Sequence, residues 1–376
     1  MRLLEITNDF PPTLGGIENY VISLASRWEP DRITVLTRWS DGADEYDSEL
    51  DFEVVREPVG TLLPTRSLFR KVQNLVRDRN IDAVHFSTAL PLGLMGPKLL
   101  RSHGVPYVVT VNGAEFVLPA SLPVGRQVLR KALKDAAVIL PYAGYLEGQV
   151  KKVFPSGPPV EAVPPGIDPA RFPIDAPPAF SSRTGGPVIL YVGRLVARKG
   201  AVVLLEAFDR VSKRHPEAHL VYVGDGPELK KLLHMSKERR LTQQVTFAGG
   251  KPWEEVPGFF ASANIFCMPV RERFGGLETE GFGIVFLEAA AAAIPSVAGD
   301  AGGARDAVIH EETGLLVDGR SVESIAGALT HLLDDPIRAQ KMGEQGRERV
   351  MNEFTWDRFY MRFREALEKH AGPGSA

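Results

Sequence analysis

Two glutamates eight residues apart bracket a glycine-rich segment that leads into an apolar helix. The segment runs from Glu280 to Glu288 as EGFGIVFLE. Because Gly281 and Gly283 have no Cβ atom, backbone N–H groups and the positive helix end can approach an anion there. The pattern predicts carboxylates on two sides of a phosphate, with Glu288 about two turns along the helix. The alternative is an ordinary glycine turn before an alanine-rich core helix, with Glu288 on a solvated flank.

A second segment, GRLVARKG, places three cations directly after a buried apolar run. The cations are Arg194, Arg198 and Lys199, and glycines flank them on both sides. Charges at the end of a buried strand cost free energy unless an anion meets them. Guanidinium and ammonium groups suit a diphosphate, whose negative charge they neutralise as it leaves. The alternative is a charge run on the surface.

Three further loops are rich in glycine. Gly15 and Gly16 precede a helix, where backbone amides can approach a phosphate or the glycines can simply turn the chain. The turns at 224–227 (GDGP) and 249–251 (GGK) can form the wall of a nucleotide-base site. Taken separately, each pattern favours the alternative of an ordinary turn.

Composition and missing motifs narrow the chemistry. The chain has 376 residues, 44% of them hydrophobic, a net charge of −3 and one cysteine, Cys267. These values predict a globular protein of two domains with no disulfide and no reason to bind nucleic acid. No G-x-x-x-x-G-K-[ST], G-x-G-x-x-G, H-E-x-x-H or Asp-x-Asp pattern occurs. We therefore expect no metal and no cofactor, with cations and helix amides in place of a metal ion.

The order of apolar runs and helical patterns predicts two parallel α/β layers. The expected strands are 3–7, 32–37, 83–86, 107–111 and 137–140, then 188–192, 219–223, 244–247, 265–268 and 296–298. A proline-rich stretch over 155–187 separates the two sets. The fold class expected is α/β, with two Rossmann-like domains facing a cleft. The boundaries expected are 1–170, a linker at 171–187, a second domain at 188–354 and a final helix at 355–376.

Taken together and in order, these segments resemble retaining glycosyltransferases of the GT-B family 4. The resemblance rests on the Gly15-Gly16 loop, PPGIDPARF at 164–172, the cation loop, GDGP at 224–227 and EGFGIVFLE, and it covers nearly the whole chain. The stretch 271–288 is most similar to phosphatidylinositol mannoside mannosyltransferases that use GDP-mannose. The resemblance to the family implies two domains that close about a hinge and a final helix that returns to the N-terminal domain.

The resemblance also implies residue roles. Arg194 and Lys199 would hold the diphosphate, Glu280 would contact hydroxyls of the donor sugar, and Glu288 would accept hydrogen bonds from the ribose. The expected donor-binding set is Gly15, Gly16, Arg194, Lys199, Gly250, Lys251, Gly281, Phe282, Gly283, Ile284, Val285 and Glu288. The expected catalytic set is Arg194, Lys199, Glu280 and Asn112. The expected acceptor-side set is Asn112, Asp168 and Arg171.

One position departs from the family pattern. Family members often carry His-Gly where this chain has Asn112-Gly113. Asparagine does not titrate, yet its amide both donates and accepts hydrogen bonds to sugar hydroxyls. The change fits a retaining mechanism in which the leaving phosphate takes the proton of the acceptor hydroxyl, and it puts a general base in doubt.

Two basic helical patterns suggest contact with an anionic membrane surface. Their cations are Arg66, Arg70, Lys71, Arg77 and Arg79 in one pattern and Arg126, Arg130, Lys131 and Lys134 in the other. The alternative is that both helices pack on the sheet with solvated charges. The N-terminus does not resemble a signal peptide and no apolar run reaches about 18 residues, so we expect a cytoplasmic protein, with peripheral contact at the inner face of the plasma membrane as a hypothesis.

The function expected is metal-independent retaining transfer of a hexose from a nucleotide sugar. Mannose from GDP-mannose is the leading donor, and a glycolipid or polyol such as a phosphatidylinositol mannoside is the expected acceptor. One alternative is a UDP-sugar-dependent transferase acting on a soluble sugar or inositol phosphate. Another is a catalytically silent nucleotide-sugar-binding protein.

Overall fold

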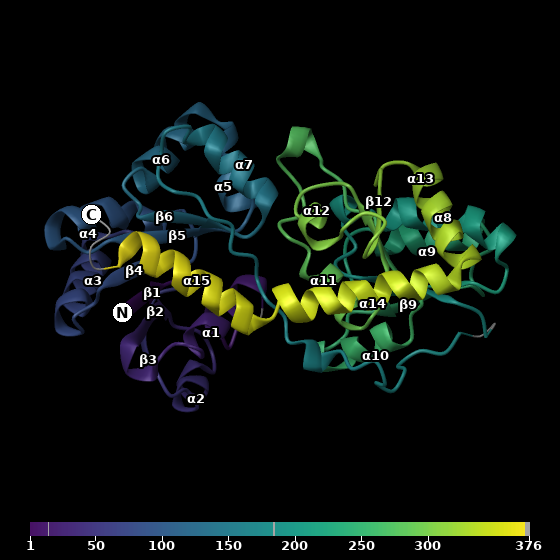
Figure 1. The fold of residues 1–376 in the computed structure, drawn as a ribbon, viewed down its shortest axis with the longest axis horizontal. Coiled ribbons are helices and arrows are strands. Elements are labelled where there is room, and N and C mark those ends of the chain that lie inside the picture. The colour runs from purple at the N-terminus through teal and green to yellow at the C-terminus, as the bar shows by residue number, and fades with distance from the viewer. Residues whose placement is uncertain (14, 183–184, 373–376) are drawn as a thin grey trace. The chain divides into compact units, whose positions relative to one another are not determined.

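The chain forms two compact units, shown in Figure 1. The computed structural model describes residues 1–13, 15–182 and 185–372. The first unit comprises Met1–Gly166 with Trp356–Ala376, and the second comprises Ile167–Thr355. Residues 171–187, expected as a linker, are grouped with the second unit. The finer domain boundaries stay predictions.

The first unit is built on a six-stranded parallel sheet with the order β3-β2-β1-β4-β5-β6. Its strands are β1 (Leu3–Ile6), β2 (Ile33–Arg38), β3 (Glu53–Glu57), β4 (Ala83–Phe86), β5 (Tyr107–Val111) and β6 (Val138–Pro141). Its helices are α1 (Gly16–Ala25), α2 (Ala43–Ser48), α3 (Arg66–Asp78), α4 (Gly96–His103), α5 (Ala114–Ser121), α6 (Pro123–Leu133), α7 (Gly144–Val153) and α15 (Trp356–Ala371), with short 3-10 turns η1 (Pro30–Arg32) and η2 (Leu92–Met95).

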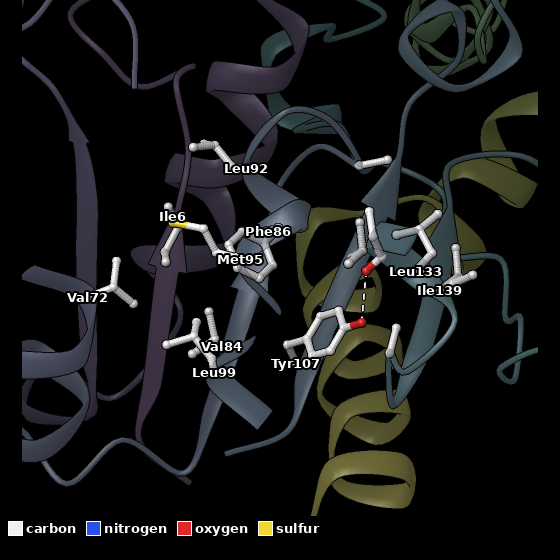
Figure 2. Close-up of a cluster of buried hydrophobic side chains, with 14 of the residues drawn as sticks. Ile6, Val72, Val84, Phe86, Leu92, Met95, Leu99, Tyr107, Leu133 and Ile139 are labelled. Carbon is white, nitrogen blue, oxygen red and sulfur yellow. Dashed lines mark hydrogen bonds between the residues drawn. The ribbon is translucent and has the colours of Figure 1, made fainter. Parts of the chain in front are cut away.

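A buried apolar cluster fills the space between this sheet and its helices (Figure 2). Ile6, Val84 and Phe86 of the central strands meet Val72 of α3 and Leu99 of α4 there. Tyr107 lies in the same cluster, and its hydroxyl donates a 2.8 Å hydrogen bond to the carbonyl oxygen of Ala132. The buried phenol therefore keeps a partner, as burial of a polar group requires.

The final helix, α15, belongs to the first unit and contacts α1, β5 and β6. Its aromatic face explains this contact. The centre of the Phe359 ring lies 4.4 Å from the centre of the Tyr20 ring. The centre of the Phe363 ring lies 4.8 Å from the centre of the His85 ring. Both phenylalanines are buried, so the helix is held by apolar burial and ring contacts.

The second unit repeats the architecture, with the strand order β12-β11-β10-β7-β8-β9. Its strands are β7 (Val188–Val192), β8 (His219–Val223), β9 (Val245–Gly249), β10 (Ile265–Met268), β11 (Ser296–Gly299) and β12 (Gly314–Val317). Its helices are α8 (Ala201–Arg214), α9 (Leu229–Glu238), α10 (Val256–Ala261), α11 (Ile284–Ala291), α12 (Ala304–Ala307), α13 (Val322–Asp334) and α14 (Pro336–Glu353). The 3-10 turns of this unit are η3 (Pro169–Arg171), η4 (Ala197–Lys199), η5 (Trp253–Glu255) and η6 (Phe274–Gly276).

The apolar faces of the two basic helices pack inward. Leu68 and Val72 of α3 and Leu129 and Leu133 of α6 are members of the buried cluster. These faces are therefore occupied by the protein core, and the cations of α3 and α6 lie on the opposite faces, while Val124 at the start of α6 is exposed. Within the described ranges, none of the helices combines the length and apolar character that crossing a bilayer requires.

Candidate active site

In the second unit, the cation loop and the glutamate segment meet at the carboxyl edge of the sheet. Arg198 forms an ion pair with the Glu280 carboxylate. The Lys199 Nζ lies 3.7 Å from the same carboxylate and 3.7 Å from the Met268 sulfur at the end of β10. Two cations thus converge on one carboxylate at the edge where α/β sheets bind ligands.

Gly200 allows this close approach. Its φ of 74° lies in the left-handed region, which glycine adopts at little cost. A Cβ atom at this position would lie 2.2 Å from the carbonyl oxygen of Pro269. Glycine is therefore required to bring the cation loop onto the end of β10 and to start α8.

The glutamate segment enters α11 later than its sequence suggests. Gly283 has a φ of 83°, so α11 begins at Ile284, after the glycines of the segment. Glu288 consequently lies about one turn into the helix, where the sequence suggested two. It is only 4% exposed, so the alternative of a solvated flank is wrong.

Burial sets the protonation of this cluster. Loss of hydration raises the pKa of Glu288 to about 8, against a smaller lowering by the charges of Lys199 and Arg171. Burial also lowers the pKa of Lys199, an effect that the Glu280 carboxylate opposes. Near neutral pH, the Glu288 carboxyl therefore holds a proton and can donate a hydrogen bond as well as accept one.

This protonation predicts a pH-dependent stability. Between pH 4.5, the ordinary pKa of the group, and about 8, the folded chain holds a proton that the unfolded chain has lost, so the free energy of unfolding falls as pH rises. Glu288→Gln removes the titration. Urea unfolding should show the wild type losing stability relative to Glu288→Gln across this window, by up to about 1.4 kcal/mol for each pH unit. A stability difference that stays constant with pH would contradict a buried, protonated Glu288.

Other expected donor residues lie in the loops after β7 and β9. Arg194 is exposed, and its carbonyl oxygen accepts a 3.0 Å hydrogen bond from the Tyr191 hydroxyl. Gly250 donates its N–H to the Asp225 carboxylate at 2.7 Å, which ties the two glycine turns after β8 and β9 together. Lys251 forms a 3.5 Å ion pair with Glu255.

Two residues expected on the acceptor side belong to the second unit. Asp168 accepts a 3.0 Å hydrogen bond from the Ala170 N–H and so starts η3. The Arg171 guanidinium lies 5.1 Å from the centre of the Trp253 ring. Its positive charge lowers the pKa of Glu288, against the larger raising effect of burial. The structure thus places the Arg171 charge near Glu288, which was expected to bind the donor, and not with Asn112 of the first unit.

In the first unit, Gly15 lies in the loop after β1, Gly16 is the first residue of α1, and Asn112 lies in the loop after β5. The Asn112 amide nitrogen donates a 3.1 Å hydrogen bond to the Ser87 carbonyl oxygen, and its backbone N–H donates to the Glu115 carboxylate. The Asn112 Oδ1 is buried and makes no hydrogen bond within the described chain. An unpaired buried acceptor is costly, so a hydrogen bond donated to this oxygen would be stabilising.

Two charged residues make contacts with the expected site residues but were not given a role from the sequence. Arg198, rather than Arg194, pairs with Glu280. The three-cation loop contained it, but residue types alone could not say which cation reaches the carboxylate. Glu115 accepts hydrogen bonds from the N–H groups of Asn112 and Gly113, and burial raises its pKa. Its position three residues after Asn112, at the start of α5, is where a carboxylate suits a helix start.

Two α/β units, each built on a six-stranded parallel sheet, form the architecture of the GT-B class of glycosyltransferases. Residues 14–171 match the family described as Glycosyltransferase Family 4, and residues 175–349 match Glycosyl transferases group 1. The chain belongs to the family-4 glycosyltransferases, which confirms the resemblance noted from its sequence.

Two relatives with assigned activities are similar over nearly their full length. The GDP-mannose-dependent alpha-(1-6)-phosphatidylinositol monomannoside mannosyltransferase of Mycolicibacterium smegmatis is 37% identical over 94% of this chain and 95% of its own. The GDP-mannose-dependent monoacylated alpha-(1-6)-phosphatidylinositol monomannoside mannosyltransferase of Corynebacterium glutamicum is 37% identical over 95% of each chain.

Solved structures support the fold. The crystal structure of Anabaena HepE in complex with UDP aligns with a TM-score of 0.81 at 18% identity and covers 98% of this chain and 100% of its own. The sucrose-phosphate synthase of Thermosynechococcus elongatus aligns with a TM-score of 0.74 at 22% identity over 98% and 99% of the two chains.

Proposed function

We propose that this protein transfers mannose from GDP-mannose to a phosphatidylinositol mannoside, with retention of configuration and without a metal ion. The observation that carries the proposal is the convergence of Arg198 and Lys199 on Glu280, beside the buried Glu288. Two cations at a sheet edge can neutralise a diphosphate. The identity of nucleotide, sugar and acceptor rests on the two mannosyltransferases that match almost the whole chain.

The proposed reaction breaks the bond between the anomeric carbon of mannose and the diphosphate oxygen, whose electron pair leaves with GDP. An acceptor hydroxyl oxygen forms the new bond to that carbon, and its proton passes to the departing phosphate. Lys199 and Arg198 stabilise the charge that grows on the diphosphate. Glu280 holds both cations in place and keeps further lone pairs for hydroxyls of the sugar.

A thermal-shift comparison of nucleotides tests the donor. We expect GDP and GDP-mannose to raise the melting temperature more than UDP, ADP and their sugars, because a ligand stabilises the state that binds it. Glu288→Ala should lose most of the shift if Glu288 bonds the ribose, whereas Glu323→Ala, at an exposed glutamate of α13, should keep it. Selective stabilisation by UDP would contradict the proposed donor.

Peripheral membrane contact is part of the proposal because the acceptor is a lipid. The supporting observation is an apolar tip where α5 meets α6. Leu118, Leu122 and Val124 are 53%, 56% and 73% exposed there, and the exposed Arg126 lies one turn further on. Apolar side chains beside cations suit the boundary of an anionic bilayer.

Flotation with anionic vesicles tests this tip. Replacing Leu118, Leu122 and Val124 together with serine should lower vesicle binding by at least about tenfold, because each buried apolar side chain contributes about 1.5 kcal/mol or more. Ile337→Ser, at a residue that is 82% exposed in the second unit, is the matched control and should bind like the wild type. Vesicle binding by the triple variant equal to that of the wild type would show that the tip does not contribute to membrane contact.

A further inference from the structure

A second site lies in the first unit, at the carboxyl ends of β2 and β3. A cavity of about 640 Å³ opens there, a volume typical of small-molecule sites. Thr13 lines it from the loop after β1, Trp39, Ser40 and Asp41 line it from the loop after β2, and Val59 lines it from the loop after β3. Three loops at the ligand-binding edge of one sheet thus form a single cavity.

Arg56 of β3 holds these loops in place. Its guanidinium donates to the carbonyl oxygens of Pro11 and Arg38 at 2.6 and 3.1 Å. It also makes a two-pronged ion pair with Asp47 of α2, with both distances 2.7 Å. The Arg56 side chain is only 8% exposed, so it serves the scaffold and not a ligand. The walls of the cavity are therefore preorganised, which reduces the entropy lost on binding.

The lining suits a sugar ring. The Trp39 side chain is 44% exposed although it lines a cavity. The negative face of an indole attracts the weakly positive C–H face of a pyranose ring. Ser40 and Thr13 offer hydroxyls, and Asp41 offers a carboxylate that accepts hydrogen bonds from sugar hydroxyls.

The charges favour an uncharged ligand over a phosphate. Arg38 is the cation that lines the cavity, and its Nε already donates to the Asn8 carbonyl oxygen at 3.0 Å. The Arg38 charge also lowers the pKa values of Asp9 and Glu18, against the larger raising effect of burial. The carboxyl group of Asp41 in the same wall matches the single cation of the lining, so an anionic ligand gains little here.

We infer that this cavity binds a hexopyranosyl ring that the acceptor already carries. The inference rests on the proposed function, in which the acceptor is a mannosylated lipid. The position of the cavity supports it, because Thr13 is two residues from Gly15 in the loop expected to touch the donor phosphate. Two residues span at most about 7 Å, so a ring held in the cavity lies within one sugar length of that loop.

Tryptophan resonances test the site without donor or lipid. The chain has four tryptophans, which 5-fluorotryptophan labelling resolves by ¹⁹F NMR, and Trp39→Phe assigns the resonance of Trp39. Methyl α-D-mannopyranoside, added to about 50 mM because a single ring binds weakly, should shift the Trp39 resonance saturably. The resonances of Trp28 and Trp356 should stay in place. An unmoved Trp39 resonance, or a shift confined to Trp253 in the second unit, would overturn the inference.

Kinetics with the mannosylated lipid give a second measure. Trp39→Ala should raise the KM for that acceptor about tenfold with kcat and the KM for GDP-mannose unchanged, because it removes an aromatic contact that is made equally before and during the reaction. Trp39→Phe should restore most of the affinity. Leu63→Ala, at an exposed residue of the same loop region that does not line the cavity, is the control.

The two proposals fail in different ways. Wild-type transfer combined with an unchanged acceptor KM in Trp39→Ala would overturn the sugar site and leave the proposed function standing. Absence of transfer by the wild type would overturn the proposed function, and the ¹⁹F titration would still decide whether the cavity binds a sugar ring.

Discussion

Lys199→Ala should lower the turnover of mannosyl transfer by on the order of a hundredfold, the cost of losing one preorganised charge-stabilising group. The Lys199 side chain is 13% exposed and lies 3.7 Å from the Glu280 carboxylate. Its ammonium is held in a site that excludes much of the water, where electrostatic stabilisation is stronger than in solution. The loss should appear in kcat under saturating GDP-mannose, since charge on the diphosphate grows in the transition state.

The matched control is Lys213→Ala. Lys213 is a surface lysine of α8 in the same unit, 71% exposed and 3.7 Å from Asp209. It should turn over like the wild type. A thermal melt of Lys199→Ala separates a catalytic loss from unfolding. Near-normal turnover in a folded Lys199→Ala chain would sink the assignment of Lys199 to the diphosphate.

His85→Ala should destabilise the first unit by about 3 kcal/mol, because it leaves a buried carboxyl group without its partner. His85 and Glu5 are both fully buried, and the His85 Nδ1 bonds the Glu5 carboxylate. The other ring nitrogen bonds the Thr110 hydroxyl at 2.7 Å, and that hydroxyl lies 3.3 Å from the Tyr20 hydroxyl. The network joins β1, β4, β5 and α1 beneath α15.

Hydrogen exchange is the suitable measurement, because a chain with two units need not unfold in one step. Amides of β1, β4 and β5 should lose protection in His85→Ala, while those of β7, β8 and β10 serve as an internal reference. Replacing Glu5 and His85 together with leucine should recover much of the loss, since both polar groups are then gone. Unchanged protection in the first unit of His85→Ala would show that the network contributes little.

The central strands of both sheets were predictable because they are short apolar runs between turns. The bounds predicted for β4, β5, β7, β8 and β10 are confirmed. The edge strands β3 and β12 were missed. In β3, EVVRE carries three charged residues and every position is only half-buried, so periodicity does not mark it. The strand forms because β2 pairs with it along five residues.

The residue types of the site could be predicted from the sequence, but the contacts between them could not. Arg198 reaches Glu280 because Gly193 and Gly200 adopt φ values of 148° and 74°, and such loop conformations depend on contacts far along the chain. Likewise, the raised pKa of Glu288 arises from its burial in the folded unit. The sequence shows that a glutamate is present but not how much of its carboxylate is exposed after folding.

Transfer of radiolabelled mannose from GDP-mannose to phosphatidylinositol monomannoside in anionic vesicles tests the central claim most directly. With EDTA present, the account predicts a dimannosylated lipid whose new bond has the α configuration of the donor. No labelled lipid from GDP-mannose, a product only from a UDP-sugar, or a β-linked product would contradict it.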